Sequence, residues 1–520
     1  MMRYIRLSMA AALLLAGSCA QEKSESYDRF EDLSLEAWIA RNHPGLSGNR
    51  QEFGAASYYI DVLDAGDAGA APVNDTVCWV KFDFSGRDLA SNIILTRRAA
   101  EAKLAGTFTK YTHYVPFYRY CGTANTGLLE ATYLAMRNEQ TLGETYVDEY
   151  NSQHPDRPIS SQLLLREGAR VVLYCPSRII GDMSGSGGYE GDGSLSSSRP
   201  VRIEMTICDT IKNPLAAEGT AVDAFCRSNG GLRIYNASDE APAGTVALPT
   251  DPADPNHPYH DNVTEQWVSA CDTVPQLYVD YRYTPDKQFD FPEPYAVGVE
   301  PYVDAGSMAA IDRRIAEALR ERFLGDDTAE YPDARTLEAD SVDMEKTTKI
   351  WYIARFLDGF VLDTNIDEVK EIVYGEVKTA GTAYDVSKSD NTPIAAWSYV
   401  LPKLKYGQWA AIATVSTHAY GAQGQQGGTQ SSSSSASSYS YYNYLNYLNY
   451  ANAYYGSSYG SYYNPYYSGY MGGLYNPYYN GYIGDLGTGD SDESTATTTI
   501  ITEIQPFTPL VFQIYVEPNE

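Results

Sequence analysis

Lys349-Ile-Trp-Tyr-Ile-Ala-Arg-Phe356 is the stretch that decides the fold. Its apolar side chains recur at every second position, at Ile350, Tyr352, Ala354 and Phe356. A period of two is typical of a β-strand with one buried face, and the Asp358-Gly359 pair that follows is a turn signal. We therefore predict a strand followed by a hairpin.

The chain around this strand continues the same small antiparallel module. Residues 393–401 are short and apolar and predict one or two helical turns, because Pro402 disfavours helical geometry in the residue before it. Residues 405–408 predict a turn, 409–415 a strand and 417–421 a loop, and the module resumes at residues 504–517.

A foreign segment interrupts this module between residues 422 and 499. It is rich in Gly, Ser, Asn and Tyr, it has no Lys or Arg, and it repeats Tyr-Asn-Pro-Tyr-Tyr. Such a composition cannot form an ordinary apolar core, so we expect a disordered or loosely collapsed insert. It is either a neutral spacer or a surface whose tyrosines contact unfolded chains and partners.

The first half of the chain repeats the same order of parts. Strand patterns at 58–63, 75–84, 169–176 and 200–207 surround a Gly/Ser-rich loop at 181–198. Gly181 follows Gly168 by 13 residues, and Gly421 follows Gly407 by 14. We interpret the two halves as a diverged internal duplication in which the first copy has lost one residue.

Composition shifts give the expected domain boundaries. Two helices are predicted at 215–228 and 308–323, and a proline-rich acidic linker at 241–258. The charges of the second helix are expected on its solvated face. The predicted order is a signal peptide (1–18), a tether (19–50), a first domain (51–211), a helix and linker (212–300) and a second domain (301–520) that contains the insert (422–499).

The N-terminus has the pattern of an export signal. Arg3 and Arg6 precede an apolar run, and Ala16-Gly17-Ser18 stands before Cys19. This resembles the lipoprotein box of bacterial lipoproteins, which implies cleavage before Cys19, lipidation of its thiol and attachment to the cell envelope. An ordinary signal peptide cleaved near Ala20 is the alternative.

Charge and cysteines limit the classes of function. The net charge of −29 would repel phosphate backbones, so we expect no nucleic-acid partner. Cys78, Cys175 and Cys208 lie in strand-like runs, where a buried free thiol is the commoner state. His257 and His260 lie in a proline-rich linker, so we expect a polar loop there and no metal site.

Several short motifs of the second half, taken in order, resemble the FKBP-type peptidyl-prolyl cis–trans isomerases. They are Tyr352, Asp358-Gly359, Leu362-Asp363-Thr364, Ile394-x-x-Trp397, Gly407-Gln408, Ala419-Tyr420-Gly421 and Pro506-Phe-Thr-Pro-Leu510-Val-Phe512. The resemblance implies an α+β fold with two FKBP-like modules, each a curved antiparallel sheet around a short helix.

The resemblance also implies a proline pocket and a role for each matching residue. Trp397 would be its floor, Tyr352 and Phe512 its walls and Asp363 a polar edge; Ile394 would present backbone, and Tyr420 would hydrogen-bond a substrate carbonyl. Rotation about an Xaa-Pro bond faces a barrier of ~18–20 kcal/mol because the amide loses resonance. A dry apolar pocket can lower that barrier without a nucleophile, a metal or a cofactor.

The sequence also departs from the family pattern. Leu362 replaces the usual Phe, Ala396 a Gly and Pro393 a Val, and in the first copy Phe82 stands for the tyrosine and Ile180 for the loop tyrosine. We therefore expect the first module to be inactive. For the second, the alternative is that its aromatic residues are only core.

The expected function is that of an exported, lipid-anchored prolyl isomerase or folding helper for proline-containing unfolded or surface proteins. The alternative is a non-catalytic binding or adhesion lipoprotein that uses the tyrosine-rich loop.

Overall fold

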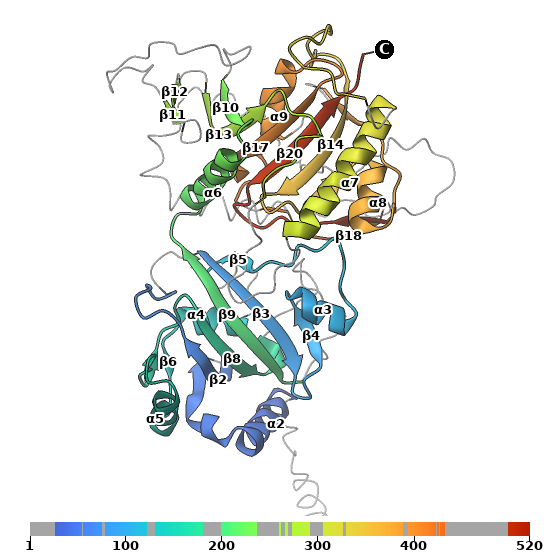
Figure 1. Ribbon diagram of the computed structural model, residues 1–520. Coiled ribbons are helices and arrows are strands. Elements are labelled where there is room, and N and C mark those ends of the chain that lie inside the picture. Colours follow the sequence, from blue (N-terminus) through green and yellow to red (C-terminus); the bar gives the residue numbers. More distant parts are fainter. Residues whose placement is uncertain are drawn as a thin grey trace, which may run out of the picture.

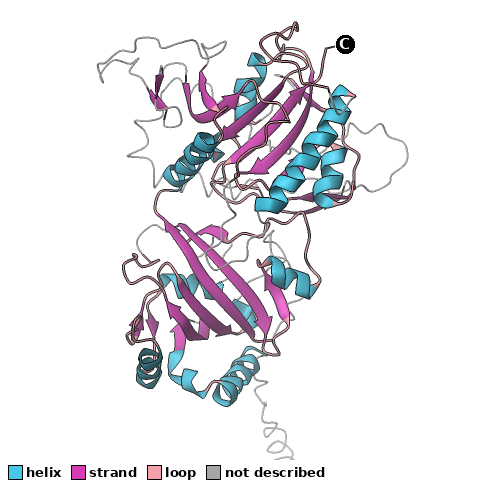
Figure 2. Cartoon of the chain, in the orientation of Figure 1, coloured by secondary structure: helices cyan, strands magenta, loops and turns pink. Residues whose placement is uncertain are grey.

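The computed structural model describes residues 27–54, 56–74, 79–121, 130–179, 199–236, 259–261, 266–268, 273–291, 305–325, 329–387, 394–422, 424–425, 427–431 and 498–519. These residues form an α+β protein built on two antiparallel sheets of seven strands (Figures 1 and 2). The signal peptide, Cys19, Cys78, Ile180, Pro393 and most of the tyrosine-rich insert lie outside them.

The second sheet contains the stretch from Lys349 to Phe356 that decides the fold. Its strand order is β10 (Arg233–Asn236), β13 (Thr273–Asp280), β17 (Trp409–Thr414), β20 (Leu510–Val516), β14 (Thr348–Phe356) and β15 (Val361–Thr364), with β16 (Tyr384–Val386) paired to β14. Gly359, with a φ of +93°, allows the tight turn between β14 and β15. The predicted strand and hairpin are confirmed.

Alternating residues of β14 enter different cores. Ile350, Tyr352 and Ala354 pack on the face that also buries helix α9 (Ala395–Val400). Trp351 and Ile353 pack on the opposite face. This central strand is therefore buried on both faces, whereas the sequence predicted one buried face.

Helices cover the two faces of the second sheet unequally. On one face lie α6 (Pro214–Ser228), α7 (Ala305–Leu324) and α8 (Asp367–Tyr374), with α7 running roughly along the direction of β14 and β20 (Figure 1). Ile315 and Leu319 of α7 are buried there, as the helical spacing predicts. The α7 charges are not all solvated, however. Asp312 is buried and accepts a hydrogen bond from Arg355 of β14 at 2.6 Å, because the arginine comes from the covered sheet face.

The first sheet repeats this strand order. It reads β1 (Arg50–Phe53), β2 (Ala56–Ala65), β8 (Ala169–Cys175), β9 (Val201–Ile211), β3 (Trp79–Asp88) and β4 (Ile93–Thr96), with β5 (Phe117–Tyr120) paired to β3. Its helices are α2 (Tyr27–Asn42), α3 (Ala99–Ala105), α4 (Glu130–Arg137) and α5 (Glu144–Gln153). Cys175 and Cys208 are buried free thiols, as expected.

The smaller elements complete the two halves. They are β6 (Gln140–Thr141) with β7 (Gln162–Leu163), β11 (Tyr259–Asp261) with β12 (Gln266–Val268), β18 (Gly428–Ser431) with β19 (Thr498–Ile501), and the 3-10 turns η1 (Pro44–Asn49), η2 (Ser177–Ile179), η4 (Leu401–Lys403) and η5 (Ser416–His418). The β18–β19 pair is the base from which the tyrosine-rich insert leaves.

Two expected segments are structured instead of extended. Within the predicted tether, α2 packs through Leu35 and Ile39 against the first sheet. Within the predicted helix-and-linker region (212–300), on either side of the proline-rich segment at 241–258, β10 and β13 form the edge of the second sheet. The sequence predicts only a short helix at 36–41 within α2, and it does not predict β10 or β13, because their partners are distant in sequence. In the part of the chain that the structure describes, no helix is both long and apolar enough to cross a bilayer.

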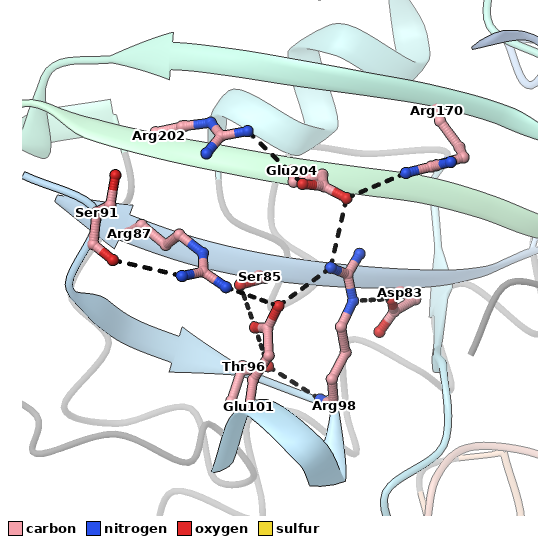
Figure 3. Close-up of polar contacts among 10 residues, drawn as sticks. All are labelled: Asp83, Ser85, Arg87, Ser91, Thr96, Arg98, Glu101, Arg170, Arg202 and Glu204. Atoms are coloured by element: carbon pink, nitrogen blue, oxygen red, sulfur yellow. Dashed lines mark hydrogen bonds and ion pairs between the residues drawn. The ribbon is translucent and has the colours of Figure 1, made fainter. Parts of the chain in front are cut away.

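The outer face of the first sheet carries charged side chains where the second sheet has an apolar face. Asp83 and Ser85 of β3 stand where β14 has Trp351 and Ile353, counted from the strand registers. Figure 3 shows the resulting network. Arg98 donates to Asp83 at 2.5 Å, and Glu101 accepts from Arg87 at 2.9 Å. These ion pairs neutralise charged side chains on a sheet face that no helix equivalent to α7 covers among the described residues.

The two domains meet through segments that follow the sheets. Glu503, between β19 and β20, forms ion pairs with Arg97 at 3.0 Å and Arg119 at 2.7 Å, both from the first domain. His113 of the first domain lies 2.6 Å from Asp358 and stacks on Phe356, in the β14–β15 hairpin. The first domain therefore contacts the hairpin that leads into Leu362 and Asp363.

Candidate functional site

The six residues proposed from the sequence lie around one core of the second domain. Tyr352, Trp397 and Phe512 are buried members of it, and Ile394 and Tyr420 are partly buried against it. Asp363 joins through a hydrogen bond to Tyr352. The structure thus brings together residues from β14, β15, β20, α9 and the loop after β17.

Trp397 is the centre of this aromatic cluster. Its ring meets Tyr352 edge-on at 5.3 Å and Phe512 edge-on at 5.7 Å between centroids. Tyr384 of β16 is a third edge-on neighbour at 6.3 Å. Edge-to-face pairs are worth about 0.5–1.5 kcal/mol each beyond their buried area, so the indole orientation is strongly specified. The indole is 1% exposed, and its N–H has no hydrogen-bond partner among the described residues.

Tyr352 and Asp363 form the polar part of the site. The Tyr352 hydroxyl donates to Asp363 Oδ2 at 2.8 Å. Burial, followed by the Asp363 charge and this hydrogen bond, raises the pKa of Tyr352 well above its ordinary value. The phenol therefore keeps its proton and remains a donor. Its backbone is fixed as well, because its N–H donates to Asn365 at 2.8 Å.

Ile394 precedes α9 and has extended geometry, with φ −52° and ψ 152°. Its carbonyl accepts from the N–H of Trp397 at 3.0 Å and of Ser398 at 3.2 Å. Its own N–H makes no hydrogen bond to another described residue. The carbonyl is therefore used by the helix, and the N–H is the backbone group that Ile394 can present.

Tyr420 is displayed by a compact turn after η5. The Ser416 carbonyl accepts from the N–H groups of Ala419 at 2.9 Å and Gly421 at 2.7 Å, and Gly421 has a φ of +67°. The Tyr420 phenol is close enough to Tyr352 to contribute to the rise in the Tyr352 pKa. The loop thus brings a second phenol to the Tyr352–Asp363 pair.

Leu362, the main departure from the family pattern, is buried in the same core. It keeps the wall apolar but removes an aromatic face. Sequence reasoning missed Tyr384, because β16 is only three residues long and offers no clear alternation. It also missed the carboxylate of Glu218, which accepts two hydrogen bonds from Ser416.

The first domain lacks these polar groups. Gly168 and Gly407 both have positive φ. The N–H of Gly168 donates to Ile207 of β9 and the N–H of Gly407 donates to Val516 of β20, both at 2.8 Å, so these two glycines can be used to superimpose one sheet on the other. The strand registers then place Phe84, Leu95 and Ile203 where the second domain has Tyr352, Asp363 and Phe512. Assigning Phe82 to the tyrosine position was wrong by one alternation.

That error has a local cause. Strand β3 continues to Asp88, and a bulge separates Lys81 from Phe82. The α4 helix also has no tryptophan. The first domain therefore retains the sheet without the polar pair or the indole.

Comparisons with known proteins give structural neighbours only. No protein-family model matches the chain, and no curated protein matches its sequence. The three FKBP domains of wheat FKBP73 are 8% identical, with 89% of this chain and 94% of that one covered and a TM-score of 0.18.

Two bacterial structures give similar values. Escherichia coli FkpA is 12% identical over 40% of this chain and 71% of its own, with a TM-score of 0.20. A peptidyl-prolyl cis–trans isomerase from Pseudomonas syringae pv. tomato is 12% identical over 37% and 99%, with a TM-score of 0.21. Scores this low do not establish a common fold, so function must be inferred from the residues and their geometry.

Proposed function

We propose that the second domain is a peptidyl-prolyl cis–trans isomerase. The observation that carries this proposal is the bonded Tyr352–Asp363 pair at 2.8 Å, set on the wall of an aromatic cluster whose centre is Trp397. Burying a carboxylate and a phenol costs free energy unless both are bonded, so a core that served only packing would be served better by apolar residues. The first domain has that apolar set.

The proposed chemistry is rotation, with no bond made or broken. A planar Xaa-Pro amide is stabilised by resonance, which the twisted state loses. A prolyl ring that packs against the Trp397 indole would be desolvated. An apolar, water-free pocket favours the twisted amide, because that amide is less polarised than the planar one.

Hydrogen bonds would fix the peptide while the bond rotates. The Ile394 N–H is a donor at the start of α9, and Tyr420 offers a phenol from the opposite loop. Groups placed in advance cost little ordering when the peptide binds. Tyr352, held by Asp363, keeps the wall rigid.

Binding requires the rim to open. Because the indole is only 1% exposed, a prolyl ring reaches it when side chains over it move. Ile394 and Tyr420 are only partly buried and come from a helix start and a turn, which can shift more easily than the strands. This near-complete burial is also the observation that favours the alternative, a binding protein whose aromatic residues are purely core.

The wider role follows from the sequence and is part of the proposal. Cys19 would carry the lipid, the protein would hang from the bacterial envelope, and its clients would be proline-containing unfolded or surface proteins. The insert leaves the described chain after β18, which follows the Tyr420 turn, and rejoins it at β19, and the proposal gives its tyrosines a role in contacting clients.

An isomerisation assay on the full chain tests the proposal. We expect faster cis–trans interconversion of an Xaa-Pro peptide, and loss of that acceleration in the double variant Tyr352→Phe with Asp363→Leu. This variant installs the apolar pair Phe84 and Leu95 of the first domain, so the fold is expected to survive. Phe84→Tyr is the matched control and should leave the rate unchanged. An inactive wild type, or an active double variant, would contradict the proposal.

A further inference from the structure

A buried carboxylate lies behind the turn that displays Tyr420. Glu218 of α6 is 4% exposed. Its two oxygens accept the N–H and the hydroxyl of Ser416, each at 2.9 Å. The carbonyl of Ser416 stabilises the Tyr420 turn, because it accepts hydrogen bonds from the N–H groups of Ala419 and Gly421. Glu218 therefore fixes the residue on which the Tyr420 turn is built.

The first domain has the same arrangement. Glu31 of α2 is 3% exposed and accepts the N–H of Ser177 at 2.7 Å. Ser177 begins η2 and Ser416 begins η5, and each stands nine residues after its glycine, Gly168 or Gly407. A helix outside the sheet thus supplies a carboxylate to the same backbone position in both domains.

The two carboxylates differ in their charged neighbours. Arg178, which follows Ser177, lies 3.7 Å from Glu31, whereas Thr417 follows Ser416. Burial raises the pKa of Glu218 to about 7, while the two hydrogen bonds from Ser416 oppose that rise. Glu218 therefore changes charge near neutral pH.

The other titratable groups on the elements packed around Glu218 are engaged elsewhere or do not contribute. Asp223 of α6 accepts from Tyr278 of β13, and Asp280 of β13 pairs with Lys287. Cys226 and Arg227 complete the titratable set of α6, and His418 of η5 lies edge-on to Tyr399. None of them is among the causes of the Glu218 shift.

We propose that Glu218 is a positioning residue for Tyr420 and makes the turn pH-sensitive. Ionised, it gives Ser416 two charge-assisted acceptors, which are stronger than neutral ones. When Glu218 is protonated, one of its oxygens becomes a donor, and its hydrogen bonds to Ser416 become weaker. The inference rests on the proposed isomerase function, because only that function gives Tyr420 a substrate to meet.

The pH profile of isomerisation in the full chain is the first test, with an Xaa-Pro peptide that has no titratable group. We expect the wild-type kcat/KM to rise with pH, with a midpoint near 7. In Glu218→Gln, it should be flat and roughly threefold to tenfold below the wild type at pH 8, the size of one lost hydrogen bond. Glu31→Gln is the matched control and should keep the wild-type profile. An unchanged profile in Glu218→Gln would overturn the proposal.

Hydrogen exchange of the amides in residues 415–422, corrected for the intrinsic pH dependence of exchange, separates this proposal from the proposed function. We expect Glu218→Gln to exchange faster than the wild type at pH 8 and equally fast at pH 6. If that difference appears in a protein without isomerase activity, the catalytic proposal fails and the hold on the turn stands. If exchange is the same at both pH values, Glu218 does not position the turn and the inference is wrong.

Discussion

Replacing Glu503 by alanine should loosen the contact between the two domains. Glu503 belongs to the second domain, and its carboxylate receives Arg97 and Arg119 of the first. Burial alone would raise the pKa of the Glu503 carboxyl, but the two guanidinium groups hold it below its ordinary value. Glu503 is therefore a buried, ionised carboxylate shared by two arginines, and its removal leaves both without their ion-pair partner.

The magnitude follows from how well those arginines can recover. Removing one partner of a buried ion pair costs about 3–5 kcal/mol. Arg97 is 2% exposed, so water cannot replace the carboxylate, but it also donates to the His113 carbonyl at 3.3 Å and lies 4.2 Å over the Phe117 ring. Arg119 is 16% exposed and can rehydrate in part. We therefore expect the lower end of the range, about 3 kcal/mol.

Urea unfolding at neutral pH measures this difference. The first transition of Glu503→Ala should occur at a lower urea concentration than that of the wild type, and the gap should narrow in acid as the wild-type carboxylate becomes protonated. Asp333→Ala is the control, because its ion pair with Arg335 is exposed and should leave the curve unchanged. A loss below about 1 kcal/mol would refute the reasoning that Glu503 is a buried carboxylate shared by two arginines.

Three further changes are predicted from single features. Because burial raises the pKa of Glu218 from its ordinary 4.5 to about 7, its contribution to stability is complete below pH 4.5 and falls by about 3 kcal/mol as pH rises to 7; urea titrations at several pH values should show that Glu218→Gln lacks this decline. Gly407→Ala should cost about 1–2 kcal/mol in thermal unfolding, since φ is +82° and the added methyl meets only Pro518 at 4.0 Å. Asp312→Ala should cost about 3–5 kcal/mol in urea, because it leaves Arg355 buried without its carboxylate, and Asp312→Asn should recover part of that loss.

The second domain was predictable where its pattern is local. Alternation along β14, the Asp358-Gly359 turn, the short α9 helix and the turn at Gly407 all follow from residues adjacent in sequence. The six candidate site residues were identified by a series of short motifs, and the structure places them around one core. Their roles in catalysis remain predictions.

What the sequence missed depends on distant partners. Glu218 in a helix looks like a solvated charge, and only the fold brings it to Ser416, 198 residues away. Asp312 looks solvated for the same reason, because Arg355 lies on another element. Strand β3 alternates cleanly, but its bulge between Lys81 and Phe82 and its continuation to Asp88 leave no signal in the sequence, so the register was misjudged.

The elements beside the two domains also depend on distant partners. The α2 helix has few apolar residues, and β10 joins β13 across a segment of low sequence signal. Pairing across such a segment leaves no local pattern. The sequence therefore predicts only a short helix at 36–41 where α2 spans 27–42, and no strands at β10 and β13.

The central claim is that the Tyr352–Asp363 pair and the Trp397 cluster form a proline site. The most direct measurement is the rate of Xaa-Pro isomerisation by the full chain, compared with Tyr352→Phe plus Asp363→Leu, whose folding is verified by circular dichroism. We predict acceleration by the wild type and none by the folded double variant. Equal rates in the two proteins, or no acceleration by the wild type, would contradict the claim.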